Sequence, residues 1–332
     1  MALTVVTGLA ALGCAAPPIT RPTSGSGPSA LATGTIPPPL PRTLEAYRGQ
    51  GAWVDVYDFV EVYAKGEPSI TPDAVDDMAA RGVHTLFLQA ARWDDDTPAG
   101  IVDPKLLWRF LSRAHRHGMH VVGWYLPHFG DVERDLDRLR QVRDFSHDGE
   151  QFDGIGIDIE YTEGVPEVSA RNAALIEVMS RFRAETTNMP IAAIVLPAVQ
   201  IEVVNKSYWP DFPYREIAPS VDIWQPMAYW SFRDPPYDDG YRFVKESIER
   251  LRNNLGDQTA RTAPIGGVAD ETKDEHMVQF AEALRDTGSI GGGMYDWNTL
   301  NPGRQWLLRN TFVDGPASAL PPPPAWPTPR PA

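Results

Sequence analysis

Short apolar runs alternate with longer amphipathic segments through the middle of the chain. The apolar runs have the length and composition expected of buried strands. They cover residues 52–59, 83–92, 120–127, 152–161, 191–197, 221–230, 262–269 and 291–298. The segments between them carry apolar residues at helical spacing, and several begin at Thr or Asp and end at glycine. Eight strands, each followed by a helix, predict a parallel sheet closed into a (β/α)8 TIM barrel, an α/β fold.

A doubly wound open sheet is the competing architecture. A nucleotide-binding sheet of that kind needs a glycine-rich loop after its first strand. The first strand is instead followed by acidic and aromatic residues, in the stretch VDVYDFVEVY at 54–63. The pattern therefore favours the barrel. Its least regular helical connection is expected around SYWPDFPYREIAP, residues 207–219.

Segments rich in proline flank the predicted barrel on both sides. Residues 15–43 and 316–332 combine Pro, Gly, Ser and Thr and lack apolar periodicity. Such segments cannot bury enough apolar surface to offset the entropy of ordering, so we expect them to be disordered linkers. The folded part is predicted to be one domain that spans residues 44–315.

The first 14 residues form an apolar run that ends at Cys14, the only cysteine of the chain. The sequence Ala11-Leu12-Gly13-Cys14 resembles a bacterial lipoprotein processing box, so Cys14 is the predicted lipidation site and the protein is expected outside the cytoplasm, anchored to the membrane. A secreted protein cut near Ala15 and a run without a targeting role are the alternatives. The run is too short to span a bilayer as a helix.

The charge balance argues against nucleic acid as a partner. The chain has 44 acidic and 30 basic residues, a formal net charge of −14, and its basic residues are scattered. Phosphate backbones attract the opposite field. The histidines His115, His117 and His120 have no spacing that would gather them around a metal, and we expect them on the solvated surface. No cofactor is indicated, and nothing in the sequence specifies the oligomeric state.

The stretch FDGIGIDIEY, residues 152–161, places carboxylates in a strand that is otherwise apolar. Asp158 and Glu160 stand at its carboxyl end, where TIM barrels carry their active sites. Residues two apart in a strand point to the same face, so both side chains enter the mouth of the barrel. Gly154 and Gly156 share that face and are expected to leave room beneath them. Two like charges in a desolvated pocket raise the pKa of one carboxyl, which becomes a proton donor. An ion pair with an arginine such as Arg92 is the structural alternative.

Aromatic and polar side chains accompany this pair at the predicted ends of the other strands. Flat aromatic surfaces stack on sugar rings, and polar groups bond to sugar hydroxyls. The candidate substrate contacts are Tyr57, Trp93, Trp124, Gln225, Met227, Trp230, Asp296 and Trp297, with Tyr229 as a further candidate for catalysis.

Three short stretches resemble glycoside hydrolase family 18, the chitinase-like barrels. The strand-four signature D-G-x-D-x-D-x-E is matched by residues 153–160, the M-x-Y signature of strand six by residues 227–229, and a glycine-rich final strand with tryptophan by residues 291–297. The resemblance implies that Glu160 is the general acid and that Asp158 orients the acetamido group of the substrate, whose oxygen acts as nucleophile. It also implies that Tyr229 binds this group and that Trp297 lies under the sugar.

The chain departs from the family pattern at three positions. Gly156 replaces the middle aspartate of the signature, and Trp230 stands where the chitinases commonly have Asp or Asn. Trp297 matches only after a shift of one residue, with Asp296 in the unshifted place. These departures leave a direct role open for Asp158 or Asp296 as nucleophile or base.

The sequence therefore predicts an exported glycosidase that cleaves a polysaccharide or oligosaccharide. Two alternatives stay open. One is a carbohydrate-binding protein without catalysis on the same barrel, suggested by Gly156. The other is a hydrolase that depends on a metal held by Asp158, Glu160 and Asp296, for which magnesium or calcium suits the oxygen ligands.

Overall fold

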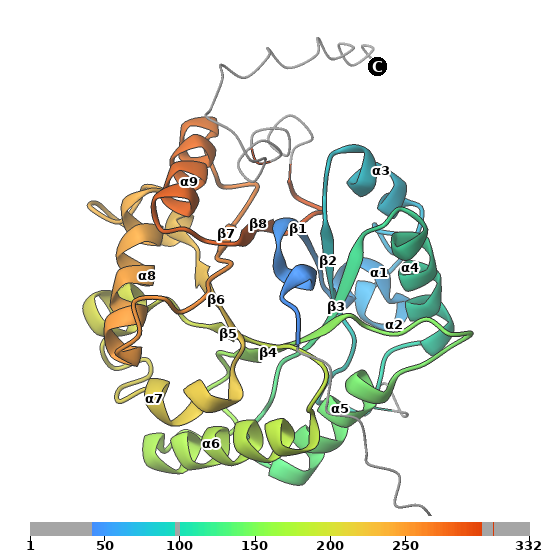
Figure 1. Cartoon of the computed structure of the whole chain (residues 1–332), viewed down its shortest axis with the longest axis horizontal. Coiled ribbons are helices and arrows are strands. Elements are labelled where there is room, and N and C mark those ends of the chain that lie inside the picture. The colour runs from blue at the N-terminus through green and yellow to red at the C-terminus, as the bar shows by residue number, and fades with distance from the viewer. Residues whose placement is uncertain (1–41, 97–99, 301–307, 309–332) are drawn as a thin grey trace, which may run out of the picture. The chain divides into compact units, whose positions relative to one another are not determined.

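The computed structural model describes residues 42–96, 100–300 and 308. Its strands pair in chain order, each parallel to the next, and the last closes on the first to complete a barrel. The strands are β1 (Gly49–Val54), β2 (Thr85–Gln89), β3 (His120–Tyr125), β4 (Gly154–Ile159), β5 (Ile191–Val195), β6 (Ile223–Ala228), β7 (Ile265–Gly267) and β8 (Gly291–Tyr295). Figure 1 shows these strands as an inner ring and the helices outside it. The predicted (β/α)8 fold is confirmed.

The outer layer consists of helices that connect successive strands. The helices are α1 (Val56–Phe59), α2 (Glu61–Ala64), α3 (Ala74–Ala80), α4 (Pro104–Arg116), α5 (Val132–Asp144), α6 (Val168–Glu185), α7 (Tyr214–Ile217), α8 (Arg242–Leu255) and α9 (Asp274–Asp286). Shorter turns of helix are η1 (Glu45–Tyr47), η2 (Gln200–Val204), η3 (Ala218–Ser220) and η4 (Trp230–Phe232). Asp103, Asp131 and Glu167 cap α4, α5 and α6 by accepting hydrogen bonds from the first free backbone N–H groups. The connection from β5 to β6 contains only η2, α7 and η3, so it is the irregular one, as predicted.

The amino-terminal end of the barrel is closed by Tyr47. In Figure 1 the blue segment that carries η1 lies within the ring of strands. The buried Tyr47 hydroxyl donates to the carbonyl oxygens of Ile155 at 2.9 Å and Pro190 at 3.0 Å. A Cβ at Gly154 would lie 2.6 Å from the same hydroxyl. The barrel is therefore closed below, and the connections that follow each strand surround its other end.

The barrel interior is packed with aromatic rings. Trp53 of β1 stacks on Phe87 of β2 with ring centroids 4.2 Å apart, and Trp124 of β3 lies 6.2 Å from Trp53. These side chains are 2–5% exposed. The rings of β1, β2 and β3 thus form a closely packed hydrophobic layer inside the barrel.

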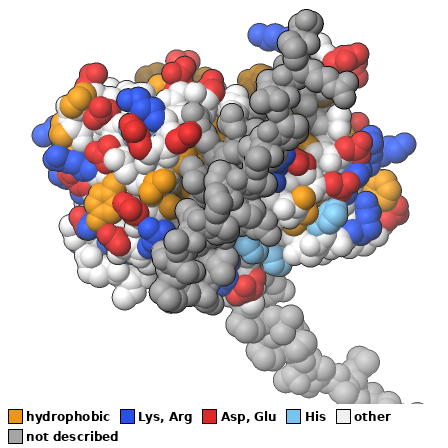
Figure 2. All heavy atoms as spheres, turned by 90° about the horizontal axis from the view of Figure 1, so that it is seen from above, with side chains coloured by type: hydrophobic (Ala, Val, Ile, Leu, Met, Phe, Trp, Pro, Cys, Tyr) orange, Lys and Arg blue, Asp and Glu red, His pale blue; other side chains and the backbone are white. Residues whose placement is uncertain are grey.

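The surface of the described residues carries charges of both signs. Figure 2 shows acidic and basic side chains interspersed over the face it presents. No helix within the described residues is long and apolar enough to cross a bilayer. The predicted lipidation site Cys14, most of the linker and the tail lie outside the described residues. Arg42, the first described residue, forms an ion pair with Asp222 at 3.0 Å.

Candidate functional site

The acidic pair of β4 lies at the carboxyl end of the barrel. Asp158 is the penultimate residue of β4, and Glu160 follows the strand directly. Register pairing places Asp158 beside Ile194 of β5, which points to the barrel interior with it. Asp158 is 7% exposed, and its Oδ1 is buried without a hydrogen-bond partner among the described residues. Glu160 is partly buried.

Burial keeps protons on this pair at a higher pH than usual. Burial raises the pKa of Asp158 well above its ordinary value, and the neighbouring charge of Glu160 raises it further. Burial also raises the pKa of Glu160. Because the two carboxyl groups interact, their pKa values belong to the pair, and the second proton leaves only at a higher pH than the first. The pair can therefore supply a proton at a pH where exposed carboxyl groups are ionised.

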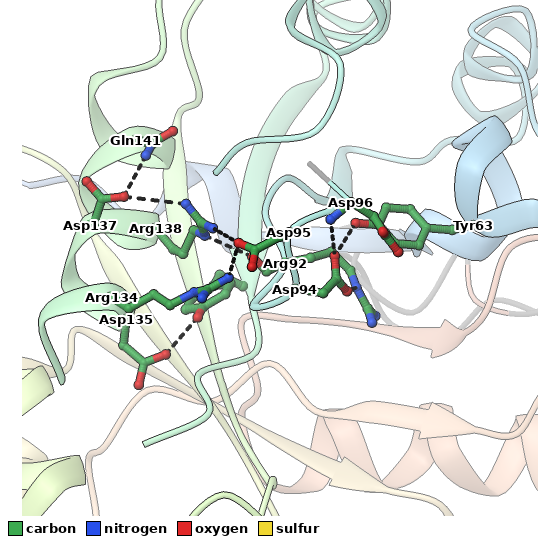
Figure 3. Close-up of polar contacts among 11 residues, drawn as sticks. Tyr63, Arg92, Asp94, Asp95, Asp96, Arg134, Asp135, Asp137, Arg138 and Gln141 are labelled. Atoms are coloured by element: carbon green, nitrogen blue, oxygen red, sulfur yellow. Dashed lines mark hydrogen bonds and ion pairs between the residues drawn. The ribbon is translucent and has the colours of Figure 1, made fainter. Parts of the chain in front are cut away.

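Arg92 does not neutralise the pair. Its guanidinium lies 2.8 Å from Asp94 and 3.0 Å from the Tyr57 hydroxyl. Figure 3 shows Arg92 and Tyr63 both beside Asp94, and Arg134 and Arg138 approaching Asp95. Arg138 Nε also donates to the Arg92 carbonyl oxygen at 3.0 Å. Within the described part of the chain, no ion pair joins Asp158 or Glu160 to a basic side chain. The alternative of an arginine-bridged pair is therefore wrong for Arg92.

The two glycines below the pair do not create the empty space that the sequence predicted. A Cβ at Gly156 would lie 2.9 Å from Ile194 Cδ1 and 3.0 Å from Trp124 Cβ. The space below Gly154 is filled by Tyr47. Aromatic and aliphatic side chains thus occupy the volume that a larger residue at position 156 would need, and the expectation of room beneath the pair is wrong.

Tyr229 brings a hydroxyl close to the acidic pair. It follows β6 and is partly buried. Burial raises the pKa of Tyr229 well above its ordinary value, and the charges of Glu160, Asp158 and Asp296 raise it further. The phenol therefore stays protonated and can donate a hydrogen bond. The Tyr229 ring lies 5.9 Å from the ring of Tyr295, whose hydroxyl donates to Asp55 in a second acidic group.

The second acidic group consists of Asp55, Asp58 and Asp296. Asp55 follows β1, Asp58 belongs to α1 and Asp296 follows β8. One carboxylate oxygen from each of the three lies within 4.8 Å of the other two. Among the described residues, Asp158, Glu160 and Asp296 form no such group, so the metal-site alternative in that form is not supported.

Trp230 was predicted to contact the substrate, and this is wrong. It is fully buried among Phe280, Met294 and other side chains of α8, α9 and β8, outside the barrel wall. Trp230 begins η4 directly after Tyr229, and its side chain packs into this outer cluster rather than into the mouth. Gly266 of β7 makes room for the indole, since a Cβ there would lie 2.8 Å from it.

Four of the predicted contacts form the buried floor of the mouth rather than its rim. Trp124 and Trp297 are 5% and 6% exposed, and both belong to the hydrophobic core. Gln225 and Met227 of β6 are buried at 1% and 4%. The Trp124 Nε1 and the Gln225 Oε1 have no hydrogen-bond partner among the described residues. This floor therefore offers polar atoms beneath the acidic pair.

Tyr57 and Trp93 are accessible, and each already contacts other side chains. Tyr57 lies in α1 rather than in the strand and is 52% exposed. Trp93 stacks on His128 with centroids 4.3 Å apart, and the Arg134 guanidinium lies 4.6 Å from the Trp93 ring centre. Together with Arg92 and Tyr161, Trp93 and His128 line a cavity of about 180 Å³. Tyr161, one of the lining residues, directly follows Glu160 in the sequence.

Two accessible aromatic residues were not among those predicted from the sequence. Tyr208, 39% exposed, lies in the irregular connection after β5, and Phe232, 59% exposed, lies in η4 after β6. Burial raises the pKa of Tyr208, and the charge of Glu160 adds to this rise. In the sequence, the adjacent aromatic residues Tyr208 and Trp209 after the fifth strand could have indicated an aromatic surface here. Trp209, its neighbour, is buried against Arg171.

Solved structures share this architecture. No protein-family model matches the sequence, and no curated protein matches it. A class V chitinase from Nicotiana tobaccum has a TM-score of 0.57 at 11% identity over 80% of this chain and 99% of that one. The spore cortex-lytic enzyme SleL from Bacillus cereus has a TM-score of 0.59 at 10% identity over 82% of this chain and 76% of that one.

The glycoside hydrolase domain of PgaB (BpsB) from Bordetella bronchiseptica has a TM-score of 0.56 at 12% identity, over 81% of this chain and 100% of that one. A mutant of the tobacco chitinase was solved in complex with NAG4. At such identities the comparison establishes a common fold. The chain has the fold of the chitinase-like glycoside hydrolase barrels, as the resemblance of its motifs implied.

Proposed function

We propose that the protein is a glycoside hydrolase in which Glu160 protonates the oxygen of the scissile glycosidic bond. The observation that carries this proposal is the buried Asp158–Glu160 pair, with raised pKa values and no basic partner among the described residues. A carboxylic acid that keeps its proton near neutrality is suited to protonate a leaving group. Structural neighbours that share the fold are named as chitinase and glycoside hydrolase, which supports the same chemistry here.

Asp158 and Tyr229 act on the sugar at the point of cleavage. As the Glu160 proton passes to the leaving oxygen, the bond from that oxygen to the anomeric carbon breaks and positive charge develops on the ring. The pair shares one proton, and when Glu160 holds it, the ionised Asp158 carboxylate stabilises this charge. The Tyr229 hydroxyl donates a hydrogen bond to the substrate. On a sugar with an acetamido group, its oxygen closes on the anomeric carbon; on other sugars, Asp158 itself is the nucleophile. Water then completes hydrolysis in either case.

The substrate is a polysaccharide or oligosaccharide that lies across the mouth of the barrel. Tyr57, Trp93 and Tyr208 present aromatic surface from the connections after β1, β2 and β5, and Asp296 presents a carboxylate after β8. Aromatic faces and a few polar groups are the usual surroundings of bound sugars. Gln225, Met227, Trp124 and Trp297 shape the floor. The complex of the tobacco chitinase mutant with NAG4 supports an oligosaccharide as ligand.

A carbohydrate-binding protein without turnover is the second candidate. The packing of Ile194 and Trp124 against Gly156 favours it, because the mouth has no third carboxylate on β4 to share charge with Asp158. In that case the same aromatic surfaces hold the glycan, and Glu160 serves only as a hydrogen-bonding group.

A panel of polysaccharides separates the two candidates. We expect the purified protein to release reducing ends from at least one glycan of the panel, and Glu160→Gln to bind that glycan while releasing reducing ends about 10²–10⁴-fold more slowly. Glu163→Gln removes an exposed carboxylate three residues away and serves as the matched control, with unchanged release. Binding without release by the unaltered protein would establish the second candidate instead.

A further inference from the structure

We propose that Asp55, Asp58 and Asp296 bind a calcium ion where β1 and β8 meet. The two strands are hydrogen-bonded neighbours that close the barrel, so the residues that follow them come together at one point of the mouth. One oxygen from each of the three carboxylates lies within 4.8 Å of the other two. Hard cations take oxygen ligands of this kind.

Asp58 supplies an observation that is independent of this proximity. It is 7% exposed, and its Oδ2 is buried without a hydrogen-bond partner among the described residues. Its Oδ1 accepts a hydrogen bond from Asn298 Nδ2 at 2.8 Å. A buried carboxylate oxygen without a donor is costly, and coordination to a cation removes that cost. One oxygen of Asp58 is therefore held by the protein and the other is free for a ligand.

The other two carboxylates are positioned by donors and are not neutralised. Tyr295 donates its hydroxyl hydrogen to Asp55 Oδ2, and Asp296 Oδ1 accepts from the Thr299 backbone N–H at 2.8 Å. Within the described residues, no ion pair joins any of the three aspartates to Lys, Arg or His. Three like charges at this spacing repel one another unless a counter-ion lies between them.

The ligand set favours calcium over magnesium and zinc. Calcium takes oxygen ligands at roughly 2.3–2.6 Å in flexible geometry, so carboxylates that other hydrogen bonds already hold in place can still ligate it. Magnesium requires roughly 2.0–2.1 Å and a stricter octahedron. Zinc prefers nitrogen and sulfur ligands, which this group does not contain. The ion would connect α1 to the end of β8.

Calorimetry on the full-length protein, stripped with a chelator and dialysed, tests this assignment. Titration with calcium chloride is expected to show one site with a dissociation constant below about 1 mM, and weaker binding of magnesium. Calcium is also expected to raise the melting temperature, because it binds the folded state alone. Asp58→Asn keeps the shape of the side chain and is expected to weaken calcium binding at least tenfold.

Glu163→Gln is the matched control, because it removes an exposed carboxylate after β4 and should bind calcium as the unaltered protein does. Asp296→Asn is the second variant, expected to weaken binding like Asp58→Asn, in case the buried position 58 does not tolerate replacement. Absence of both binding heat and a melting shift at about 10 mM calcium, well above the range of known sites, would overturn the proposal. Equal binding by Asp296→Asn and the unaltered protein, or by magnesium and calcium, would also overturn it.

Discussion

Gly156 occupies the position at which the resembling family carries the middle aspartate of its strand-four signature. Ile194 and Trp124 fill the volume that a side chain there would take, with contacts of 2.9 and 3.0 Å to an added Cβ. The departure from the signature is thus matched by the packing of the neighbouring strands. Within this signature, Glu160 is therefore the carboxylate whose charge acts on Asp158.

Gly156→Asp is predicted to destabilise the protein by about 1–3 kcal/mol, because it overfills a packed interior and buries a further carboxylate. Denaturant unfolding measures the change. Gly66→Asp is the control, since an added Cβ at Gly66 meets nothing within 4 Å and should alter stability little. Equal stability of the Gly156→Asp variant and the unaltered protein would contradict the packing account.

Tyr229→Phe removes a hydroxyl that burial and nearby carboxylates keep protonated. A hydrogen bond from this group to a charged reaction centre contributes about 1.5–3 kcal/mol, so kcat is predicted to fall roughly 10–100-fold with little change in stability. Steady-state kinetics on the glycan identified in the panel, together with thermal unfolding, provide the test. An unchanged kcat would exclude Tyr229 from the reaction.

The acidic pair could be located from the sequence because strand alternation and its place at a strand end are local features. Asp158 and Glu160 differ in position by two, which fixes their common face without knowledge of the fold's details. The aromatic candidates could not be sorted in this way. Trp230 and Tyr229 are adjacent, and only the exact end of the strand decides which of them enters the mouth. Tyr208 lies in an irregular connection, where no periodic pattern indicates the direction of its side chain.

At the scale of elements, α4 is tied to the turn before β4 by His115. Its Nδ1 contacts Glu150, and its Nε2 lies 3.1 Å from Asp153 Oδ2. The hydrogen bonds to Asp153 and Glu150 raise the pKa of His115 to about 9. The expectation of a solvated surface histidine is therefore wrong, since the partners come from a distant part of the sequence.

His115→Asn is predicted to destabilise the protein, and the raised pKa of His115 sets the pH range over which it does so. The folded-state pKa is raised from 6.5, so the charged histidine stabilises fully below pH 6.5, and the contribution is lost as pH rises through 9. We expect a loss on the order of 1–2 kcal/mol at pH 6, reduced by solvent screening, and a much smaller one at pH 10.

Urea unfolding of both proteins at the two pH values gives the difference. His147→Asn controls for the removal of a surface imidazole, since His147 is 40% exposed. A loss for His115→Asn that is the same at pH 6 and pH 10 would contradict the ion-pair account.

The existence and order of the strands were predictable, and their limits were not. Every apolar run overlaps one strand, because strands buried on both faces are continuously hydrophobic. β1, however, begins at Gly49 and ends at Val54. The residues predicted to end this strand form α1 instead. Asp55 caps this helix by accepting from the Tyr57 N–H, a local bond that outweighs the strand pattern.

At the scale of the whole molecule, eight repeats of strand and helix specify the closed barrel. Closure brings residues after β1 and β8 together although they are far apart in the sequence. For this reason the sequence grouped Asp296 with Asp158 and Glu160, whereas the structure groups it with Asp55 and Asp58. Long-range neighbours of this kind follow from barrel geometry rather than from local pattern.

The amino-terminal run predicts attachment of the whole molecule to a membrane through Cys14. Expressed in a bacterium with lipoprotein processing, the full-length chain is expected to partition into detergent in a phase-separation assay, and Cys14→Ser into the aqueous phase. Equal partitioning of the two proteins would contradict lipidation at Cys14. An aqueous full-length chain recovered outside the cytoplasm would instead fit the secreted alternative.

The rate of glycan cleavage as a function of pH, measured for the unaltered protein and for Glu160→Gln, tests the proposed mechanism most directly. Because the proton donor has a pKa raised from 4.5, the rate is predicted to persist above that pH and to fall as the pair loses its remaining proton. Glu160→Gln is predicted to be about 10²–10⁴-fold slower, without this alkaline decline. A variant that cleaves as fast as the unaltered protein, with the same pH dependence, would contradict the assignment of Glu160 as the acid.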